Sequence, residues 1–352
     1  MKAILPSGVP QAGAHAPAHP WHPEHHRLHR HLLHHPTLLP RGSRLLLAVS
    51  GGQDSMTLVR LLQDLNRLHL WQLHLWHGDH GWHDGSAGTA TELARWLTRT
   101  GHSLLIDRAE PVMTEARNEA QARQWRYRKL LERARDLNCS HVVTGHTASD
   151  RAETLVMNLA RGSHRRGLAS LRPNRPLEER ELARPLLIFS RRETARMVQI
   201  LKLPVWPDPS NADLSYERNR VRQEVMPILD TLHPGVEQRL AALAERLAQE
   251  EDGASELTDL ALATLRQADN SLHRQGLTSL GSANQRRLLQ AWLGQSAGLR
   301  LRAAELEGLL ARLTARTRSG SMDLSGGWRL QWRGDALTLA PPSSPAAADE
   351  HR

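Results

Sequence analysis

Short apolar runs alternate with longer amphipathic segments between residues 44 and 160. RLLLAVS at 44–50, residues 71–81, residues 103–109 and HVVTGH at 141–146 are typical of buried strands. Apolar residues at helical spacing follow them at 54–65, 87–100, 114–138 and 149–160. Because right-handed crossovers return each strand in the same direction, this alternation predicts an α/β fold with a parallel sheet covered on both faces.

Polar sequences stand where the predicted strands end. SGGQDS at 50–55, HGDHG at 77–81 and TGHTASD at 144–150 each come directly after a strand. The carboxyl ends of parallel strands share one edge of the sheet, and ligands of such sheets bind beyond that edge. We therefore expect these three sequences to meet in one site.

The rest of the chain has a different pattern. Residues 161–184 are rich in Arg, Gly and Pro, which predicts a long mobile loop, and 204–211 is rich in turn residues. From about residue 233 only helical periodicity remains, until residues 322–341 alternate like a strand pair. We predict an α/β domain over 41–228 and a smaller, mainly helical domain over 229–340 that ends in the strand pair.

The two ends are expected to be disordered tails, 1–40 and 341–352. The first forty residues contain nine histidines among Pro and Ala. A metal-binding tract is the alternative interpretation, but no cysteine or carboxylate pattern accompanies these histidines.

Composition narrows the classes of function. The 352 residues carry a formal charge of +9, with lysine only at Lys2, Lys129 and Lys202. An arginine-rich positive surface suits a polyanion such as nucleic acid, although genome composition or a bias for solubility would explain it equally. No apolar run reaches the roughly 20 residues that cross a bilayer, so no membrane is expected. A lone Cys139 excludes a disulfide framework within one chain and favours a reducing, cytoplasmic setting.

The glycine sequence after the first strand is the clearest chemical motif. Gly51 and Gly52 allow consecutive N–H groups to converge on an anion at the start of a helix. Ser50 and Ser55 add hydroxyl donors, and Asp54 could hold Mg²⁺ among phosphate oxygens. No Gly-Lys-Ser/Thr follows, which excludes a Walker A loop, and a third glycine of the dinucleotide fingerprint is missing. An ordinary turn is the alternative.

Three more groups of residues are candidates for the site. Arg123 and Arg126 lie three apart on one helical face, with Glu119 four residues before Arg123; a solvated helix face is the alternative. Asp150 and Glu153 open another helix, where acids can simply complement the helix dipole below a Thr147 or Ser149 cap. His77, His80 and His146 stand at strand ends, where a structural histidine is the alternative to a catalyst, and they do not form a convincing zinc set.

These motifs together resemble a known family. LAVSGGQDS resembles the PP-loop of the N-type ATP pyrophosphatases. HGDHG, NEAQARQWRYRKL at 118–130 and TGHTASDRAETLVMNLARGSHRRGLASL at 144–171 resemble segments of the tRNA(Ile)-lysidine synthetases within that superfamily. RPLLIFSRRE, WPDPSNADLSYERNRVR and HPGVEQRL match in order and spacing, so the resemblance covers about residues 44–240.

The resemblance implies a fold and a reaction. The fold is a Rossmann-like sheet of the adenine nucleotide α-hydrolase type. ATP, with Mg²⁺, would adenylate C2–O of the wobble cytidine in the CAU anticodon of tRNA(Ile) and release pyrophosphate. Free L-lysine would then displace AMP and leave lysidine. The enzyme would be a ligase, with the helical domain on the tRNA, and it could form a homodimer.

The resemblance also implies roles for residues. The loop from Ser50 through Gly51, Gly52, Gln53 and Asp54 to Ser55 would hold ATP and pyrophosphate. Arg123 and Arg126 would neutralise the α-phosphate, with Glu119 orienting them, while Asp150 and Glu153 would bind the lysine ammonium or Mg²⁺. His80 or His146 could take the proton of the attacking amine. Relatives commonly carry two adjacent acids where this chain has Ser149 before Asp150, which would leave the metal to Asp54 and Asp150.

Contacts to tRNA are expected from arginines in the 161–184 loop. A clamp on the RNA backbone would use Arg161, Arg165, Arg166 and Arg172, and a solvated loop is the alternative. Arg218 and Arg222 in YERNRVR could reach phosphates as well, or fasten the last helix to the sheet.

Two other functions compete with this interpretation. A PP-loop thiolase that makes 2-thiocytidine generally needs a cysteine pair or an iron–sulfur cluster, which one cysteine cannot supply. A non-catalytic RNA-binding protein would not need Ser50, Asp54 and Ser55 together.

Overall fold

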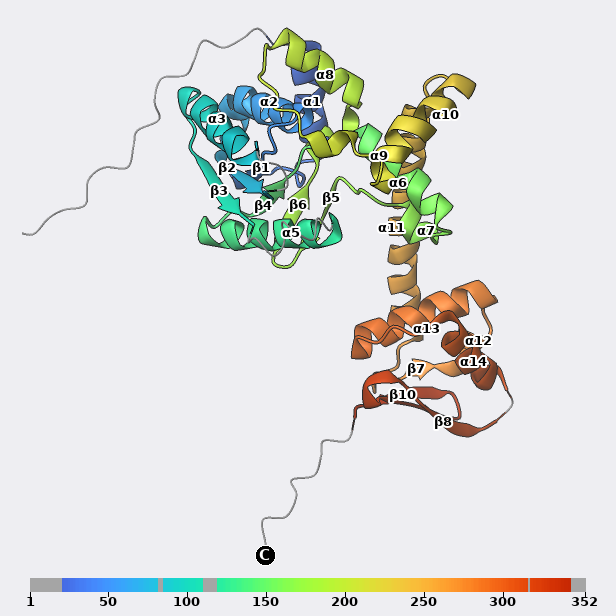
Figure 1. The fold of residues 1–352 in the computed structure, drawn as a ribbon. Coiled ribbons are helices and arrows are strands. Elements are labelled where there is room, and N and C mark those ends of the chain that lie inside the picture. The colour runs from blue at the N-terminus through green and yellow to red at the C-terminus, as the bar shows by residue number, and fades with distance from the viewer. Residues whose placement is uncertain (1–20, 82–84, 110–118, 316, 343–352) are drawn as a thin grey trace, which may run out of the picture. The chain divides into compact units, whose positions relative to one another are not determined.

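The structure is a computed structural model that describes residues 21–81, 85–109, 119–315 and 317–342 (Figure 1). The chain divides into two compact units, residues 1–248 and 249–352. The division lies within helix α11 (Val236–Leu265), later in the chain than the boundary that the sequence indicates near residue 230. In the part of the chain that is described, no helix is both long and apolar enough to cross a bilayer.

A six-stranded sheet forms the first unit, in the order β3-β2-β1-β4-β6-β5. Its strands are β1 (Arg44–Ala48), β2 (Gln72–Asp79), β3 (Leu104–Arg108), β4 (His141–Val143), β5 (Asn174–Leu177) and β6 (Arg180–Ala183). β1 lies parallel to both β2 and β4, with Leu45 opposite Leu73 on one side and His141 on the other. β2 and β3, and β4 and β6, are also parallel, and β5 alone runs antiparallel at the edge. The predicted α/β class is confirmed.

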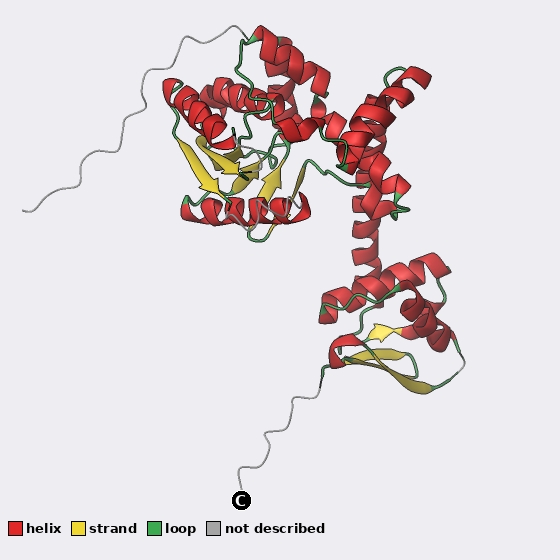
Figure 2. Cartoon of the chain, viewed as in Figure 1, coloured by secondary structure: helices red, strands yellow, loops and turns green. Residues whose placement is uncertain are grey.

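Helices cover both faces of this sheet (Figure 2). α1 (Pro23–His34), α2 (Gln53–His69), α3 (Ser86–Arg99) and α8 (Arg191–Ile200) lie on one face, and α5 (Glu119–Asp136) lies on the other. Successive side chains of a strand point to opposite faces. Leu45 and Leu47 accordingly pack under α2, whereas Leu46 packs on the α5 side. Because both faces are buried, the strand is apolar at every position from Leu45 to Leu47.

The prediction of a disordered tail over residues 1–40 is wrong for its second half, which contains helix α1. α1 places Leu28 and Leu32 in the core with 0% and 3% of their surface exposed. Leucines four apart form one helical face, and the surrounding histidines concealed that spacing. Residues 1–20 and 343–352 of the predicted tails lie outside the described part.

The expected mobile loop at 161–184 is also wrong over most of its length. It contains the short helix α7 (Arg165–Leu168) and the hairpin of β5 and β6, and β6 extends the sheet beside β4. The turn between the two strands has Glu178 at a φ of 52°. Arg and Pro are rare in central strands, but this hairpin is at the edge, where proline costs no ladder bond.

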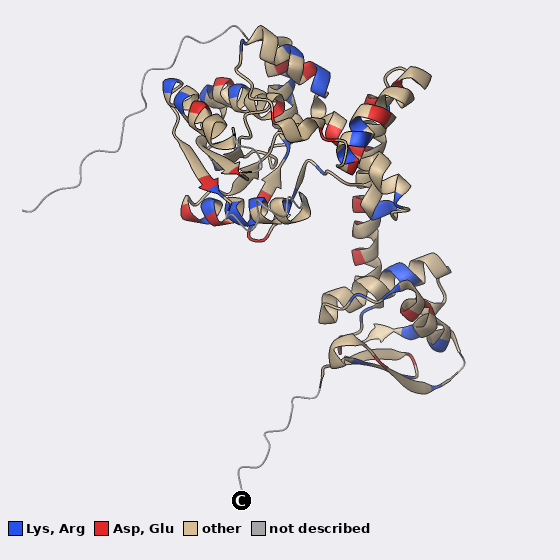
Figure 3. Cartoon of the chain, in the orientation of Figure 1, with Lys and Arg blue, Asp and Glu red and all other residues tan. Residues whose placement is uncertain are grey.

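Short helices complete the first unit. They are α6 (Ala148–Ala160), η1 (Pro185–Ile188), η2 (Pro209–Ala212), α9 (Glu217–Arg220), η3 (Val221–Val225) and α10 (Met226–Leu232). Figure 3 marks the positions of charged residues along the ribbon, and in the sequence of α5 Lys and Arg outnumber Asp and Glu.

The second unit has its own sheet and core. α12 (Arg274–Thr278), α13 (Ser282–Ala297) and α14 (Ala303–Thr314) accompany an antiparallel sheet in the order β7-β10-β9-β8. Its strands are β7 (Leu272–His273), β8 (Ser319–Asp323), β9 (Arg329–Arg333) and β10 (Ala336–Ala340), with η4 (Ser325–Gly327) between β8 and β9. Trp292, Leu289 and Leu330 are among its buried residues. The predicted strand pair is therefore part of a larger sheet.

Candidate active site

Two loops meet where the strand order of the first sheet reverses, between β1 and β4. The loop after β1 carries Ser50 to Ser55, and the loop after β4 carries Gly145 and His146. A Cβ atom on Gly145 would lie 3.1 Å from the backbone of Asp54 and Ser55. The absence of a side chain at Gly145 thus lets the loops touch at the edge where such sheets bind ligands.

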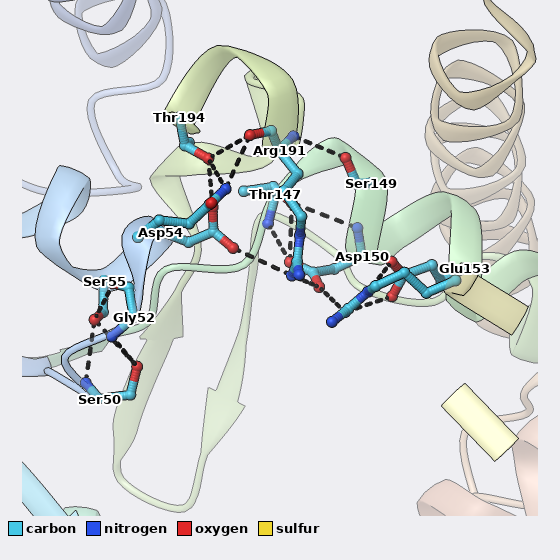
Figure 4. Close-up of polar contacts among 12 residues, drawn as sticks. Ser50, Gly52, Asp54, Ser55, Thr147, Ser149, Asp150, Glu153, Arg191 and Thr194 are labelled. Atoms are coloured by element: carbon cyan, nitrogen blue, oxygen red, sulfur yellow. Dashed lines mark hydrogen bonds and ion pairs between the residues drawn. The ribbon is translucent and has the colours of Figure 1, made fainter. Parts of the chain in front are cut away.

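The loop after β1 forms a closed cradle at the N-terminus of α2 (Figure 4). Gly51 has a φ of 83°, which glycine adopts without strain. The hydroxyl of Ser55 accepts from the Ser50 N–H at 3.2 Å and donates to the Gly52 carbonyl at 2.9 Å. The Gly52 N–H donates to the Ser50 hydroxyl at 3.3 Å. The positive end of the α2 dipole at this loop is an environment that suits an anion such as phosphate.

Asp54 projects from the start of α2 toward α8. One oxygen accepts a hydrogen bond from the Thr194 hydroxyl, and the other lies 3.2 Å from Nη2 of Arg191. Gln53 supports this contact, because its amide donates to the Arg191 carbonyl at 2.9 Å. Burial and the neighbouring Asp150 raise the pKa of Asp54, although Arg191 opposes the shift. The Asp54 carboxylate is therefore short of positive charge.

Asp150 and Glu153 lie in the first two turns of α6, which Thr147 caps. Asp150 accepts the Thr147 N–H at 2.7 Å and lies 2.7 Å from Nη2 of Arg218. Glu153 accepts from Nε of Arg218 at 3.0 Å and from Nε of Arg222 at 2.7 Å. Burial alone would raise the pKa of Asp150, but Arg218 and the nearby cations hold it well below its usual value.

Arg191 connects the two loops, and the sequence analysis gave it no role. Its Nη2 lies 3.2 Å from Asp54 and 3.3 Å from Asp150, as Figure 4 shows. The sequence does hold a signal for its position: Ser190 and Glu193 form a capping box that starts α8 at Arg191. Three arginines thus balance three carboxylates here, namely Arg191, Arg218 and Arg222 against Asp54, Asp150 and Glu153.

Ser149 precedes Asp150 on α6 and is buried. Its hydroxyl donates to Glu237 at 2.6 Å and accepts the Arg191 N–H at 2.8 Å. Ser149 therefore joins α6 to α8 and α11, and it lies in the hydrogen-bonded frame of the site.

The donor set fits a Mg²⁺ ion that is held largely by phosphate. Among the described residues, no cluster of three or more His, Cys, Asp or Glu side chains could hold a metal. Asp54 and Asp150 share one cationic partner, and one or two carboxylates plus substrate phosphates are what Mg²⁺ usually binds.

The three predicted histidines have different environments. His77 is buried, and its Nδ1 bonds the Val49 carbonyl at 2.7 Å, which fits the structural alternative. Burial, with help from Arg126, lowers the pKa of His80 to about 4, and its Nε2 accepts from Arg126 at 3.1 Å. Burial lowers the pKa of His146 to about 3. Since a general base works best near the operating pH, these values disfavour both His80 and His146 as bases at neutral pH.

The two arginines of α5 have different partners. Arg126 contacts His80, whereas Arg123 contacts the hydroxyl of Tyr127 at 3.4 Å and stacks on its ring. Glu119 begins α5, but its side chain lies outside the described part.

The four arginines of the predicted tRNA clamp have different environments. Arg161 pairs with Glu217. Arg165 and Arg166 are exposed on α7, and Arg172 is half-buried. Arg218 and Arg222 pair with the α6 acids, which fits the fastening alternative.

The chain is similar to proteins of known function. The family model of the PP-loop domain matches residues 24–229. A tRNA(Ile)-lysidine synthase of Parasynechococcus marenigrum is 51% identical over 329 residues, 92% of this chain and 96% of that protein. One from Prochlorococcus marinus strain SARG is 40% identical over 91% of this chain and 97% of the relative.

A solved structure shares the fold. The U34-tRNA thiolase NcsA of Methanococcus maripaludis, with its [4Fe-4S] cluster, superposes with a TM-score of 0.54 and 20% identity over 64% of this chain and 79% of its own. This likeness concerns the fold alone. Cys139 is buried, which raises its pKa to about 11. Its thiol therefore stays protonated at neutral pH, unlike a reactive cysteine.

Proposed function

Because the chain belongs to the tRNA(Ile)-lysidine synthase family of PP-loop proteins, we propose that it ligates free L-lysine to C2 of the wobble cytidine of tRNA(Ile) at the expense of ATP. The observation that carries this proposal is the serine–glycine cradle at the reversal of strand order, within a chain that matches such synthases over about nine-tenths of its length.

The cradle suits the first half of the reaction. The cytidine O2 attacks the α-phosphorus of ATP, an O–P bond forms, and the bond to the β-phosphate oxygen breaks. The N–H groups and hydroxyls between Ser50 and Ser55 would bind the departing pyrophosphate. Arg123 and Arg126 remain our candidates for the α-phosphate.

Magnesium would be held by Asp54 and Asp150, where it would neutralise phosphate charge. Burial raises the pKa of Asp54, so a cation beside this carboxylate is favoured. In the structure, the Arg191 guanidinium contacts both carboxylates.

Lysine would enter in the second half of the reaction. Its ε-amine attacks C2, AMP leaves with the electrons of the C2–O bond, and the new C–N nitrogen releases its proton to solvent water. Asp150 and Glu153 are our candidates for attracting the lysine ammonium. Because the carboxylates are already balanced by arginines, the ammonium must replace one arginine contact. The Arg191 contacts at 3.2 and 3.3 Å are longer than the 2.7 Å contacts of Arg218 and Arg222, so they should exchange first.

A homodimer is part of the proposal. Ile228 and Leu232 on α10 expose 62% and 65% of their surface, apolar area that a second copy could cover. Sedimentation equilibrium distinguishes a dimer from a monomer.

Labelled lysine tests the function directly. Purified protein with ATP, Mg²⁺, [¹⁴C]lysine and a tRNA(Ile) carrying a CAU anticodon should yield labelled tRNA and AMP in equal amounts. The same tRNA with uridine at the wobble position is the matched control and should stay unlabelled. Absence of label in both tRNAs would contradict the proposal.

A further inference from the structure

Three arginines surround the side chain of Tyr127 on α5. The guanidinium carbons of Arg123 and Arg175 lie 5.1 and 5.3 Å from the centre of its ring. Arg184 lies close enough to this side chain for its charge to lower the pKa of Tyr127. The three come from α5, from β5 and from the residue directly after β6, so the fold gathers them from separate parts of the sequence.

No acid compensates this cluster within the described residues. Arg123, Arg175 and Arg184 form no ion pair there, and Arg175 and Arg123 both lower the pKa of Arg184. In contrast, the buried Arg151 pairs with Glu245, and Arg222 pairs with Glu153. Arg123 is exposed and Arg175 is half-buried, so the cost of an unpaired buried charge falls on Arg184, and an anion beside it would offset that cost.

Arg184 is the buried member of the cluster, and its hydrogen bonding is incomplete. It is 2% exposed, its Nη1 donates to the Arg172 carbonyl at 2.7 Å, and its Nε has no partner. Burial lowers the pKa of its guanidinium, and Arg175 and Arg123 add to this shift. A buried N–H without an acceptor is unusual in a folded protein.

The cluster lies at the edge of the sheet that carries the site. Arg184 follows β6, which is parallel to β4, and His146 follows β4. Arg184 and Arg123 are among the charges that act on His146. β4 separates the cluster from β1, whose loop forms the phosphate cradle. An anion bound by the cluster would therefore lie on the same edge of the sheet as the proposed ATP site. It would be separate from the phosphate that the Ser50–Ser55 loop would bind.

This inference rests on the proposed function. We propose that Arg175 and Arg184, held with Arg123 around Tyr127, bind a phosphodiester of the tRNA strand next to the target cytidine. Guanidinium groups match two phosphate oxygens at once, and stacking on an aromatic ring fixes their orientation beforehand. The bound phosphate would position the nucleotide for attack, which makes these arginines positioning residues.

Binding of tRNA as a function of salt tests the inference without ATP or lysine. Arg175→Ala should raise the Kd for the CAU tRNA about tenfold and reduce the slope of log K against log salt by about one, as loss of one phosphate contact does. The matched control is Arg41→Ala, which removes the same charge from an exposed position just before β1, at the opposite edge of the sheet. The control should retain the wild-type Kd and slope.

A second variant reports on the buried member. Arg184→Gln keeps hydrogen-bonding capacity but removes the charge, and it should lose affinity in the same direction. If circular dichroism shows that Arg184→Gln does not fold, the tRNA affinity and salt slope of Arg175→Ala and Tyr127→Phe test the phosphodiester site in its place. Arg123 is left unchanged, because we also assign it to the α-phosphate.

The outcomes separate the two proposals. If the wild-type protein bound no tRNA, the proposed function would be wrong. If it bound tRNA and Arg175→Ala had an unchanged slope, only the phosphodiester site would be wrong. If Arg175→Ala weakened the binding of ATP alone, measured by equilibrium dialysis, while tRNA affinity stayed normal, the anion would be a nucleotide phosphate and the tRNA assignment would fall.

Discussion

Asp54 and Asp150 are two carboxylates of one cluster with opposite electrostatics. Burial, with Asp150, raises the pKa of Asp54, whereas Arg218 and its neighbours overcome burial at Asp150 and lower its pKa. The cause is the number of partners. Asp54 has one arginine and a threonine hydroxyl, while Asp150 has contacts from three arginines and a backbone N–H.

Asp54→Asn should affect chemistry. We expect adenylation to fall by about 10²-fold or more, because a charge beside the transferring phosphoryl group is lost. Release of AMP in the presence of tRNA and lysine measures this. Asp136→Asn, at the exposed end of α5, is the matched control and should keep wild-type activity. Near-normal AMP release from Asp54→Asn would remove Asp54 from the mechanism.

Asp150→Asn should affect stability in addition to any effect on chemistry. A carboxyl whose folded pKa is depressed stabilises the fold above its unfolded pKa of about 4, and this stabilisation is lost as pH falls. At pH 7 the variant should lose about 3 kcal/mol of unfolding free energy, since three arginine contacts lose their charge. Urea denaturation measures it.

The stability of Asp54→Asn provides the comparison with Asp150→Asn. Its raised pKa means that the ionised form costs stability at pH 7, so neutralising it should leave the urea midpoint unchanged or higher. Equal losses in both variants would show that the two carboxylates are electrostatically alike.

At the scale of elements, α1 shows how composition can conceal a helix. Its exposed side is dominated by histidine and arginine, whereas Leu28 and Leu32 pack in the core against α2 and the buried His25 contacts Asp64 of α2 at 3.0 Å. Glu24 also pairs with Arg196 on α8. The helix is therefore part of the catalytic unit.

Truncation of one leucine tests this placement. Leu28→Ala should destabilise the protein by about 2–5 kcal/mol, the usual cost of a cavity in a packed core. Leu33→Ala, on the same helix and 62% exposed, should change stability by less than about 0.5 kcal/mol. Thermal unfolding of both variants measures the difference. A similar, small loss of stability in both variants would show that α1 does not pack in the core.

At the scale of the whole molecule, partly buried histidines make the fold sensitive to acid. Burial lowers the pKa of His146 to about 3 and that of His80 to about 4. In the unfolded chain a histidine takes up its proton near pH 6.5. Because only the unfolded state binds these protons between pH 6.5 and 4, stability is lost as pH falls through this window.

His146→Gln should make the stability curve flatter. The wild-type melting temperature should fall as pH decreases from 6.5 to 4.5, and the variant should fall less, because glutamine takes up no proton when the chain unfolds. Calorimetry at several pH values gives both slopes. Parallel slopes would show that His146 is protonated in the folded state.

The periodicity of residues predicted the strands around β1 and β4 and the helices after them, because apolar spacing reflects burial directly. It did not predict β5 and β6. Their Arg, Pro and Glu residues resemble a loop, and they become strands because β6 pairs with β4 and β5 pairs with β6 at the edge of the sheet.

The sequence by itself determined the parallel sheet, the glycine cradle and, through its motifs, the family. These depend on local order along the chain. Tertiary structure decided which charges meet: Arg191 joins Asp54 to Asp150, and Arg175 and Arg184 join Arg123 at Tyr127. Pairing energies depend on distance and burial, and the fold sets both between residues that are far apart in the chain.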